Sequence, residues 1–193
     1  MNPPLHVFPA VDPARGRAIA EAYARLPVNV YGADRETTRA YDALAAELPA
    51  HYARACARFD VRHVATDPYR GSGDMVADML RGRLRVFAGG APHPVLSARG
   101  LPRGIGPAHV NLNDALRAVH DVQHFDLRAG FSASGEDAVY RAHREAFGPL
   151  ATRALATETR GQNSVYNFGP APGTYAVQKV AVLPGLYVWT DRD

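Results

Sequence analysis

The feature that most constrains this chain is a long apolar stripe in its first third. Large apolar residues recur at steps of three and four positions between residues 41 and 56, the period of one face of an α-helix. This helix is predicted to start after Asp34, with Glu36 in its first turn. Pro49 interrupts the pattern, which predicts a kink or a division into two helices. The stripe consists of Tyr41, Leu44, Leu48, Tyr52 and Cys56.

Further helices are predicted by caps and by glycine or proline stops. Asp12-Pro13 can begin a helix that ends near Leu26, and Asn111 or Asn113 can cap one that runs to Leu127 and closes at Gly130. Ser134 and Asp137 form a near capping box for the next helix. Short helices are also expected after Ser72 or Asp74, over Leu150–Thr159 and over Tyr175–Leu183.

Strands are fewer than helices. Short strands are expected at Val61–Ala65, Leu84–Phe87 and Leu186–Trp189. Three prolines make residues 1–11 an extended N-terminal arm, and the proline- and glycine-rich residues 91–107 a long irregular loop. We therefore expect a mainly α fold with a minor α+β character: a bundle-like single domain covering residues 1–193.

Composition excludes some classes of protein. The 22 basic and 19 acidic residues are interspersed, so the formal charge of +3 predicts no nucleic-acid partner. Cys56 is the only cysteine, which excludes a disulfide framework and a thiolate metal cluster. No signal peptide and no membrane-spanning apolar run is recognisable, so a cytoplasmic location is expected.

Two histidines carry the clearest chemical signal. His120 and His124 lie four residues apart in a predicted helix, so both rings project from one face and can bind one cation. Asp121 points about 100° away and can orient a ligand. The alternative is that both are ordinary hydrogen-bonded histidines.

The next two predicted helices add carboxylates and a third histidine. Glu136 and His143 are seven residues apart and therefore share a face, and Glu158 lies near the end of the following helix. Facing helices that direct Glu and His to a shared interior build helical di-iron and di-manganese sites. The sequence has neither Glu-x-x-His in these helices nor the zinc motif His-Glu-x-x-His.

Residues 157–163, TETRGQN, form a polar run between apolar segments. It is either an exposed loop or a buried network, and the apolar residues on both sides favour the network. In that interpretation Arg160 holds a substrate carboxylate or phosphate in a bidentate manner. Tyr140 and Gln162 act as hydrogen-bond donors around the metal ligands.

The strings RAVHDVQHF, GEDAVYRAH, ALATETRGQNSVYNFGP and QKVAVLP together resemble a pattern of uncharacterised phage and actinobacterial proteins. The resemblance covers about residues 66–184, and Gln123 stands where the family pattern has glycine. The resemblance implies that the polar run forms one site. It does not imply any particular activity.

A looser resemblance is to HD-domain metal enzymes. His93, the pair His120-Asp121 and a later acid such as Asp137 can be aligned with their ligand pattern. His93 lies between two prolines, where a ligand on a helix is not expected.

The leading hypothesis is a non-haem metal enzyme that oxidises or oxygenates a small, anionic molecule. The expected ligands are His120, His124, Glu136, His143 and Glu158, with iron as the metal and manganese or zinc as alternatives. Two alternatives stay open: a metal-dependent hydrolase of HD-like type, and a non-catalytic binding or accessory protein. A homodimer is also compatible with the sequence.

Overall fold

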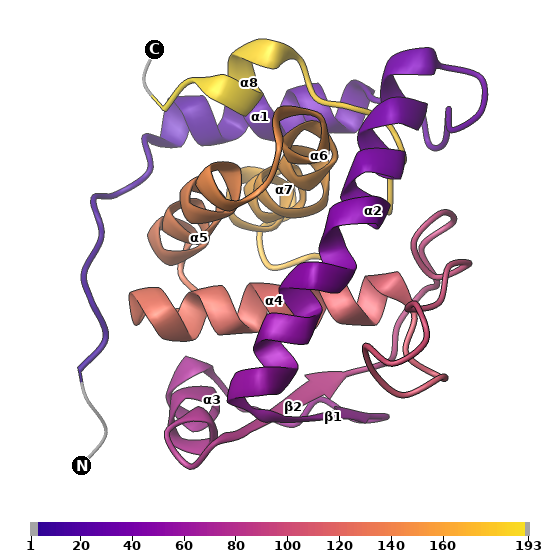
Figure 1. Cartoon of the computed structure of the whole chain (residues 1–193). Helices are drawn as coiled ribbons and strands as arrows, with labels where there is room; N and C mark the ends of the chain where they lie inside the picture. The colour runs from indigo at the N-terminus through magenta and orange to yellow at the C-terminus, as the bar shows by residue number, and fades with distance from the viewer. Residues whose placement is uncertain (1–3, 192–193) are drawn as a thin grey trace. The chain divides into compact units, whose positions relative to one another are not determined.

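The computed structural model describes residues 4–191 and confirms a mainly α fold with a minor β component (Figure 1). No described helix is both long and apolar enough to cross a bilayer. The elements are α1 (Pro13–Arg25), α2 (Arg35–Arg58), β1 (Asp60–Val64), α3 (Ser72–Met79), β2 (Arg83–Phe87), α4 (Leu112–Leu127), α5 (Ala133–Ala146), α6 (Pro149–Leu155), the π-helical η1 (Ala156–Gly161), α7 (Gln162–Phe168) and α8 (Gly185–Trp189).

The chain divides into two compact units. Unit 1 combines the described residues of Met1–Val7 with Ala45–Phe131, and unit 2 combines Phe8–Leu44 with Ser132 onward. Each unit is thus built from two separate stretches of chain, and α2 contributes residues to both. The expected single domain over residues 1–193 stays a prediction.

Unit 1 contains a parallel pair of strands beside α3 and α4 (Figure 1). β1 and β2 are joined through α3, the kind of crossover that parallel strands require. In β2, Leu84 and Val86 are buried, whereas the alternate residues Arg83 and Arg85 face water. Burial of one face therefore explains why this short, alternating segment is a strand, one residue longer than predicted.

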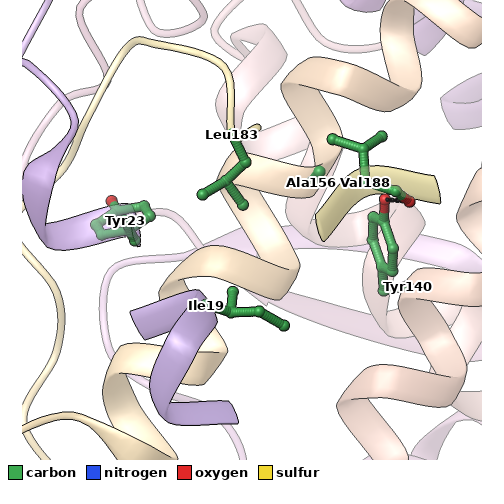
Figure 2. Close-up of a cluster of buried hydrophobic side chains, with 6 residues drawn as sticks. All are labelled: Ile19, Tyr23, Tyr140, Ala156, Leu183 and Val188. Atoms are coloured by element: carbon green, nitrogen blue, oxygen red, sulfur yellow. Dashed lines mark hydrogen bonds between the residues drawn. The ribbon is translucent and has the colours of Figure 1, made fainter. Parts of the chain in front are cut away.

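Unit 2 is a helical cluster in which α1 packs on α7, and α5 on α6, η1 and α7. Gly16 allows the close approach of α1 and α7, because a Cβ there would lie 2.4 Å from the Phe168 ring. Figure 2 shows the buried core of this unit, in which the Tyr140 hydroxyl points at the backbone of Val188. The core cluster consists of Ile19, Tyr23, Tyr140, Ala156, Leu183 and Val188.

The C-terminal assignments are wrong. Residues 175–183 are not helical, because the backbone of Val180 bonds to Val28 and Val30 instead of to its own segment. Residues 186–189 belong to helix α8 instead of a strand, and α8 begins directly after Pro184. In both cases contacts with distant residues outweigh the weak local preference.

Some predicted helix boundaries also move. Pro49 lies inside one continuous α2, so a division into two helices is wrong, and a kink at Pro49 stays a prediction. The cap of α5 is Ser132, whose hydroxyl accepts from the Gly135 amide, and not Ser134. Helix α4 ends at Leu127 as predicted, but the residue that closes it is Arg128, with a left-handed φ of 52°, and not Gly130.

Loop segments occur where the sequence places them. Residues 4–11 of the expected arm have neither helix nor strand, and residues 1–3 of that arm lie outside the described residues. Residues 91–107 form turns and bends, with one isolated bridge between Gly100 and Asn111.

Candidate metal site and polar network

Helix α4 positions the histidine pair in unit 1. Its N-terminus is capped by Asn111, whose side-chain oxygen accepts from the Asp114 amide at 3.0 Å. The four-residue spacing then places His120 and His124 one above the other on the same face. His124 is fully buried and His120 half-buried, so the pair has a buried and an accessible end.

The two rings meet through their Nε2 atoms, which are 3.1 Å apart. The ring centroids are separated by 4.7 Å with planes at 76°. Two imidazole nitrogens on one ion, each about 2.0–2.1 Å from it, lie roughly 2.9–3.4 Å apart in octahedral or tetrahedral geometry. The pair can therefore hold one metal ion; without metal, the same distance suits one N–H···N hydrogen bond.

The far nitrogen of His124 has a backbone partner. Its Nδ1 lies 3.2 Å from the carbonyl oxygen of Ala129, just past the left-handed turn at Arg128. A carbonyl can only accept, so Nδ1 carries the hydrogen, and in the neutral ring Nε2 then keeps its lone pair. This is the tautomer that binds a metal through Nε2. We expected Asp121 to fix a histidine tautomer; at His124 the Ala129 carbonyl does so, and the role of Asp121 stays a prediction.

Glu136 lies in the first turn of α5 in unit 2. Its Oε2 accepts a hydrogen bond of 2.8 Å from the side-chain amide of Asn163 on α7. A neutral amide donor orients a carboxylate without adding a charge.

Glu158 belongs to the π-helical turn η1 and has three protein donors. Gln162 and Gln178 donate to its Oε2 at 3.0 and 2.9 Å, and the Tyr41 hydroxyl donates to Oε1. Burial and the neighbouring Glu158 raise the pKa of Tyr41 well above its ordinary value, so Tyr41 stays a neutral donor. Gln162 donates to Glu158; its predicted role beside a metal ligand and the ligand role of Glu158 both stay predictions.

The polar run is a buried network, as its apolar neighbours indicated. Thr157, Thr159 and Arg160 are buried, and the Thr157 hydroxyl donates to the Ala181 carbonyl at 2.8 Å. Gly161 admits the ring of Tyr23, since a Cβ there would lie 2.5 Å from it. π-Helical turns of this kind recur at functional sites, which keeps this segment of interest.

Arg160 is 4% exposed and is surrounded by acceptors from its own unit. Nε and Nη2 donate to Asp137 at 3.2 and 2.8 Å, and Nη2 also donates to Asp191 at 2.8 Å. Nη1 donates to the carbonyls of Tyr187 and Thr190 at 2.9 and 3.1 Å. These bonds use all five guanidinium hydrogens. An anionic substrate would have to displace one of these acceptors, and the clamp stays a prediction.

Tyr140 lies beneath Arg160. The guanidinium carbon is 4.2 Å from the ring centroid of Tyr140, a cation–π contact, and the hydroxyl donates to Val188 at 2.8 Å. Burial raises the pKa of this hydroxyl to about 12, although Arg160 and Arg144 act in the opposite direction. In this structure Tyr140 supports the arginine; its predicted donor role near a metal is not tested.

Two other histidines have structural surroundings. His143 is 1% exposed and meets Phe147 edge to face at a centroid distance of 5.9 Å, and its ligand role also stays a prediction. His93 uses Nδ1 to accept from the amides of Val95 and Leu96 at 3.0 and 2.9 Å. That nitrogen caps a turn, which does not suit it to the ligand role of the HD-like alternative.

The sequence did not predict several hydrogen-bond partners of the candidate site residues. Asp191 and Tyr41 lie far along the chain from Arg160 and Glu158, and no local pattern connects them. The Ala129 carbonyl is a backbone group, which carries no residue-type signal. Asp137 carried a signal, since it follows Glu136 within the same motif, but we considered it only as a cap or an HD-like ligand.

No family model, curated protein or solved structure matches the chain. The resemblance to phage and actinobacterial proteins therefore stays an expectation. Function has to be argued from the side chains themselves.

Proposed function

We propose that this chain is a metal-dependent enzyme in which His120, His124 and Glu136 bind one ion. Iron is the first candidate, with manganese and zinc as alternatives. The reaction we propose is oxidation or oxygenation of a small molecule.

The observation that carries the proposal is the 3.1 Å separation of the two Nε2 atoms. Helical spacing alone brings two histidines to one face, but it does not turn both Nε2 atoms toward one point. The Ala129 carbonyl supports the proposal, because it holds His124 in the tautomer that a metal needs. His124 also lies in the last turn of α4, where the helix dipole favours a cation.

Glu136 is proposed as the third ligand because its residue type suits a two-histidine site. Five residues, 128–132, connect α4 to α5, so Glu136 in the first turn of α5 is tethered near α4 in sequence. Two histidines and one carboxylate form the ligand set of non-haem iron oxygenases, which leaves coordination positions for dioxygen and substrate. The anionic charge of Glu136 would also offset part of the charge of a divalent ion.

Elemental analysis of full-length protein purified without chelator tests the proposal. We expect close to one iron, manganese or zinc per chain, and at least tenfold less in the double variant His120→Ala/His124→Ala. Glu136→Gln is expected to weaken retention of the metal, because a carboxamide is a poorer ligand than a carboxylate. Circular dichroism checks that each variant remains helical.

The matched control is His6→Ala/His109→Ala, which removes two exposed histidines of unit 1 and should keep the full metal content. Equal metal content in the His120/His124 variant and the parent would refute the site. Dioxygen uptake by the ferrous protein separates oxidation from the hydrolase alternative, in which a metal-bound water is the reactant.

A further inference from the structure

Unit 2 contains a cavity of about 280 Å³ that the proposed metal site does not explain. Helices α1, α5 and α7 and the C-terminal segment contribute its walls. Small-molecule sites begin at about this size. Charged, amide and apolar side chains line the cavity; those that matter here are Arg15, Arg141, Arg160, Asn163, Asn167 and Phe168.

The acidic side chains of this wall already have partners. Asp137 and Asp191 accept from Arg160, and Asp191 also accepts from Arg144 at 2.7 Å. Asp12 accepts from the Ala14 amide as the cap of α1. The bonds from Arg144 and Arg160 also overcome the effect of burial and lower the pKa of Asp191 to about 2, so it is anionic at neutral pH. A cationic ligand would therefore compete with arginines that lie within hydrogen-bond distance.

Arg141 differs from Arg160 in the donors that remain. Its Nη2 lies 2.6 Å from Asp137, but no acceptor within residues 4–191 bonds to its Nε, which is 3.7 Å from Asp191. The network of Arg141, Arg144 and Arg160 with Asp137 and Asp191 carries three positive and two negative charges, a net charge of +1. Arg144 does not line the cavity, and the charged residues that do, three arginines and three aspartates, have a formal sum of zero. The unused donor of Arg141, and not a surplus of charge, therefore favours an anion.

The other lining groups favour an organic ligand over a bare inorganic anion. Ile19 and Phe168 offer apolar surface, and Asn163 and Asn167 offer amide groups. Asn163 also donates to Glu136, so this residue connects the cavity wall to a proposed metal ligand within unit 2. A ligand with an apolar body and one anionic group satisfies both kinds of wall.

We propose that this cavity binds a small organic carboxylate, with Arg141 as the group that bonds the carboxylate. Arg15 and Arg160 line the same cavity, and protein acceptors hold both in place. If the cavity is the substrate pocket, the substrate of the proposed enzyme is an organic carboxylate, and this part of the inference rests on the proposed function. Binding itself requires no metal.

Calorimetric titration of the full chain with benzoate and with benzamide tests this inference. The two probes have nearly the same shape, and only benzoate carries the charge. We expect benzoate to bind at least about tenfold more tightly, the difference typical of charged hydrogen bonds. Phenyl phosphate is a third probe, and tighter binding of it than of benzoate would overturn the choice of a carboxylate.

Two variants locate the site. Arg141→Gln should weaken benzoate binding about tenfold or more, whereas Arg17→Gln, an exposed arginine of α1, should not change it. Ala133→Leu adds bulk to a lining position without changing a charge and should also abolish binding. Undiminished binding by both Arg141→Gln and Ala133→Leu would refute the cavity as the site.

Repeating the titration after chelator treatment separates this inference from the proposed function. Binding of benzoate by metal-free protein supports the pocket whatever the metal content. Metal that is present without any preference for benzoate over benzamide supports the metal site and refutes the pocket.

Discussion

The sequence predicted that the histidine pair of unit 1 and the arginine network of unit 2 belong to one functional site. The two regions differ in how their side-chain nitrogen atoms are bonded. His120 and His124 point nitrogen atoms at each other, and one of these has a tautomer fixed by a backbone carbonyl. Arg160 has all five of its hydrogens bonded to protein acceptors. Two imidazole nitrogens that face each other can bind one metal ion, so the histidine pair is a candidate site. A guanidinium with five bonded hydrogens holds the protein together, so Arg160 is structural.

The comparison also explains why arginine suits the second role. A planar guanidinium can join several segments at once, and Arg160 bonds α5, α8 and the residues after it. An imidazole has only two nitrogens, so it makes few contacts but can exchange a hydrogen bond for a metal.

The largest expected effect comes from Arg160→Leu. Removing a buried arginine takes one charged partner from each of Asp137 and Asp191, which should lower the free energy of unfolding by about 3–5 kcal/mol. Urea denaturation measures this loss, and Arg25→Leu, whose side chain is 77% exposed, is the control with a change below about 1 kcal/mol. A loss as small as that of the control would contradict a structural Arg160.

A smaller, pH-dependent effect is expected for Asp191→Asn. The pKa of Asp191 is about 2 in the folded protein, below its ordinary value of 3.8, so its stabilising contribution is present above pH 4 and is lost as the pH falls toward 2. After allowance for solvent screening, we expect the parent to be about 1 kcal/mol more stable than the variant at pH 6. Urea unfolding at several pH values measures this difference.

The difference between the parent and Asp191→Asn should shrink toward zero near pH 2. Asp67→Asn, at an exposed loop aspartate, provides the control. A difference that stays constant between pH 6 and pH 2 would show that the charge of Asp191 does not contribute.

The smallest effect is expected for His120→Gln in chelator-treated protein. Without metal the two rings share one hydrogen bond and His120 is half-buried, so the unfolding free energy should fall by about 1 kcal/mol. In the parent, added metal should raise the melting temperature, and His120→Gln should remove most of this rise. A metal-free loss as large as that of Arg160→Leu would make the histidine pair structural and remove the contrast between the two regions.

Much of the fold was accessible from local pattern. The stripe from Tyr41 to Cys56 predicted α2, and Asp12 and Asn111 marked the starts of α1 and α4. The segment 175–183 was mispredicted because Val180 bonds to Val28 and Val30, about 150 residues earlier in the chain. Of the candidate site, spacing predicted that His120 and His124 share a face, but it did not indicate that Arg160 would be saturated.

By itself the sequence determined which residues share a helical face and where most helices begin, because periodicity and caps act over a few neighbouring residues. Only the tertiary structure decided which polar groups are already satisfied. Arg160 meets acceptors 23 to 31 residues away, and Glu158 meets Tyr41 at a separation of 117 residues. Such partners are chosen by packing, which no local pattern encodes, and they decide which side chains remain able to bind a ligand.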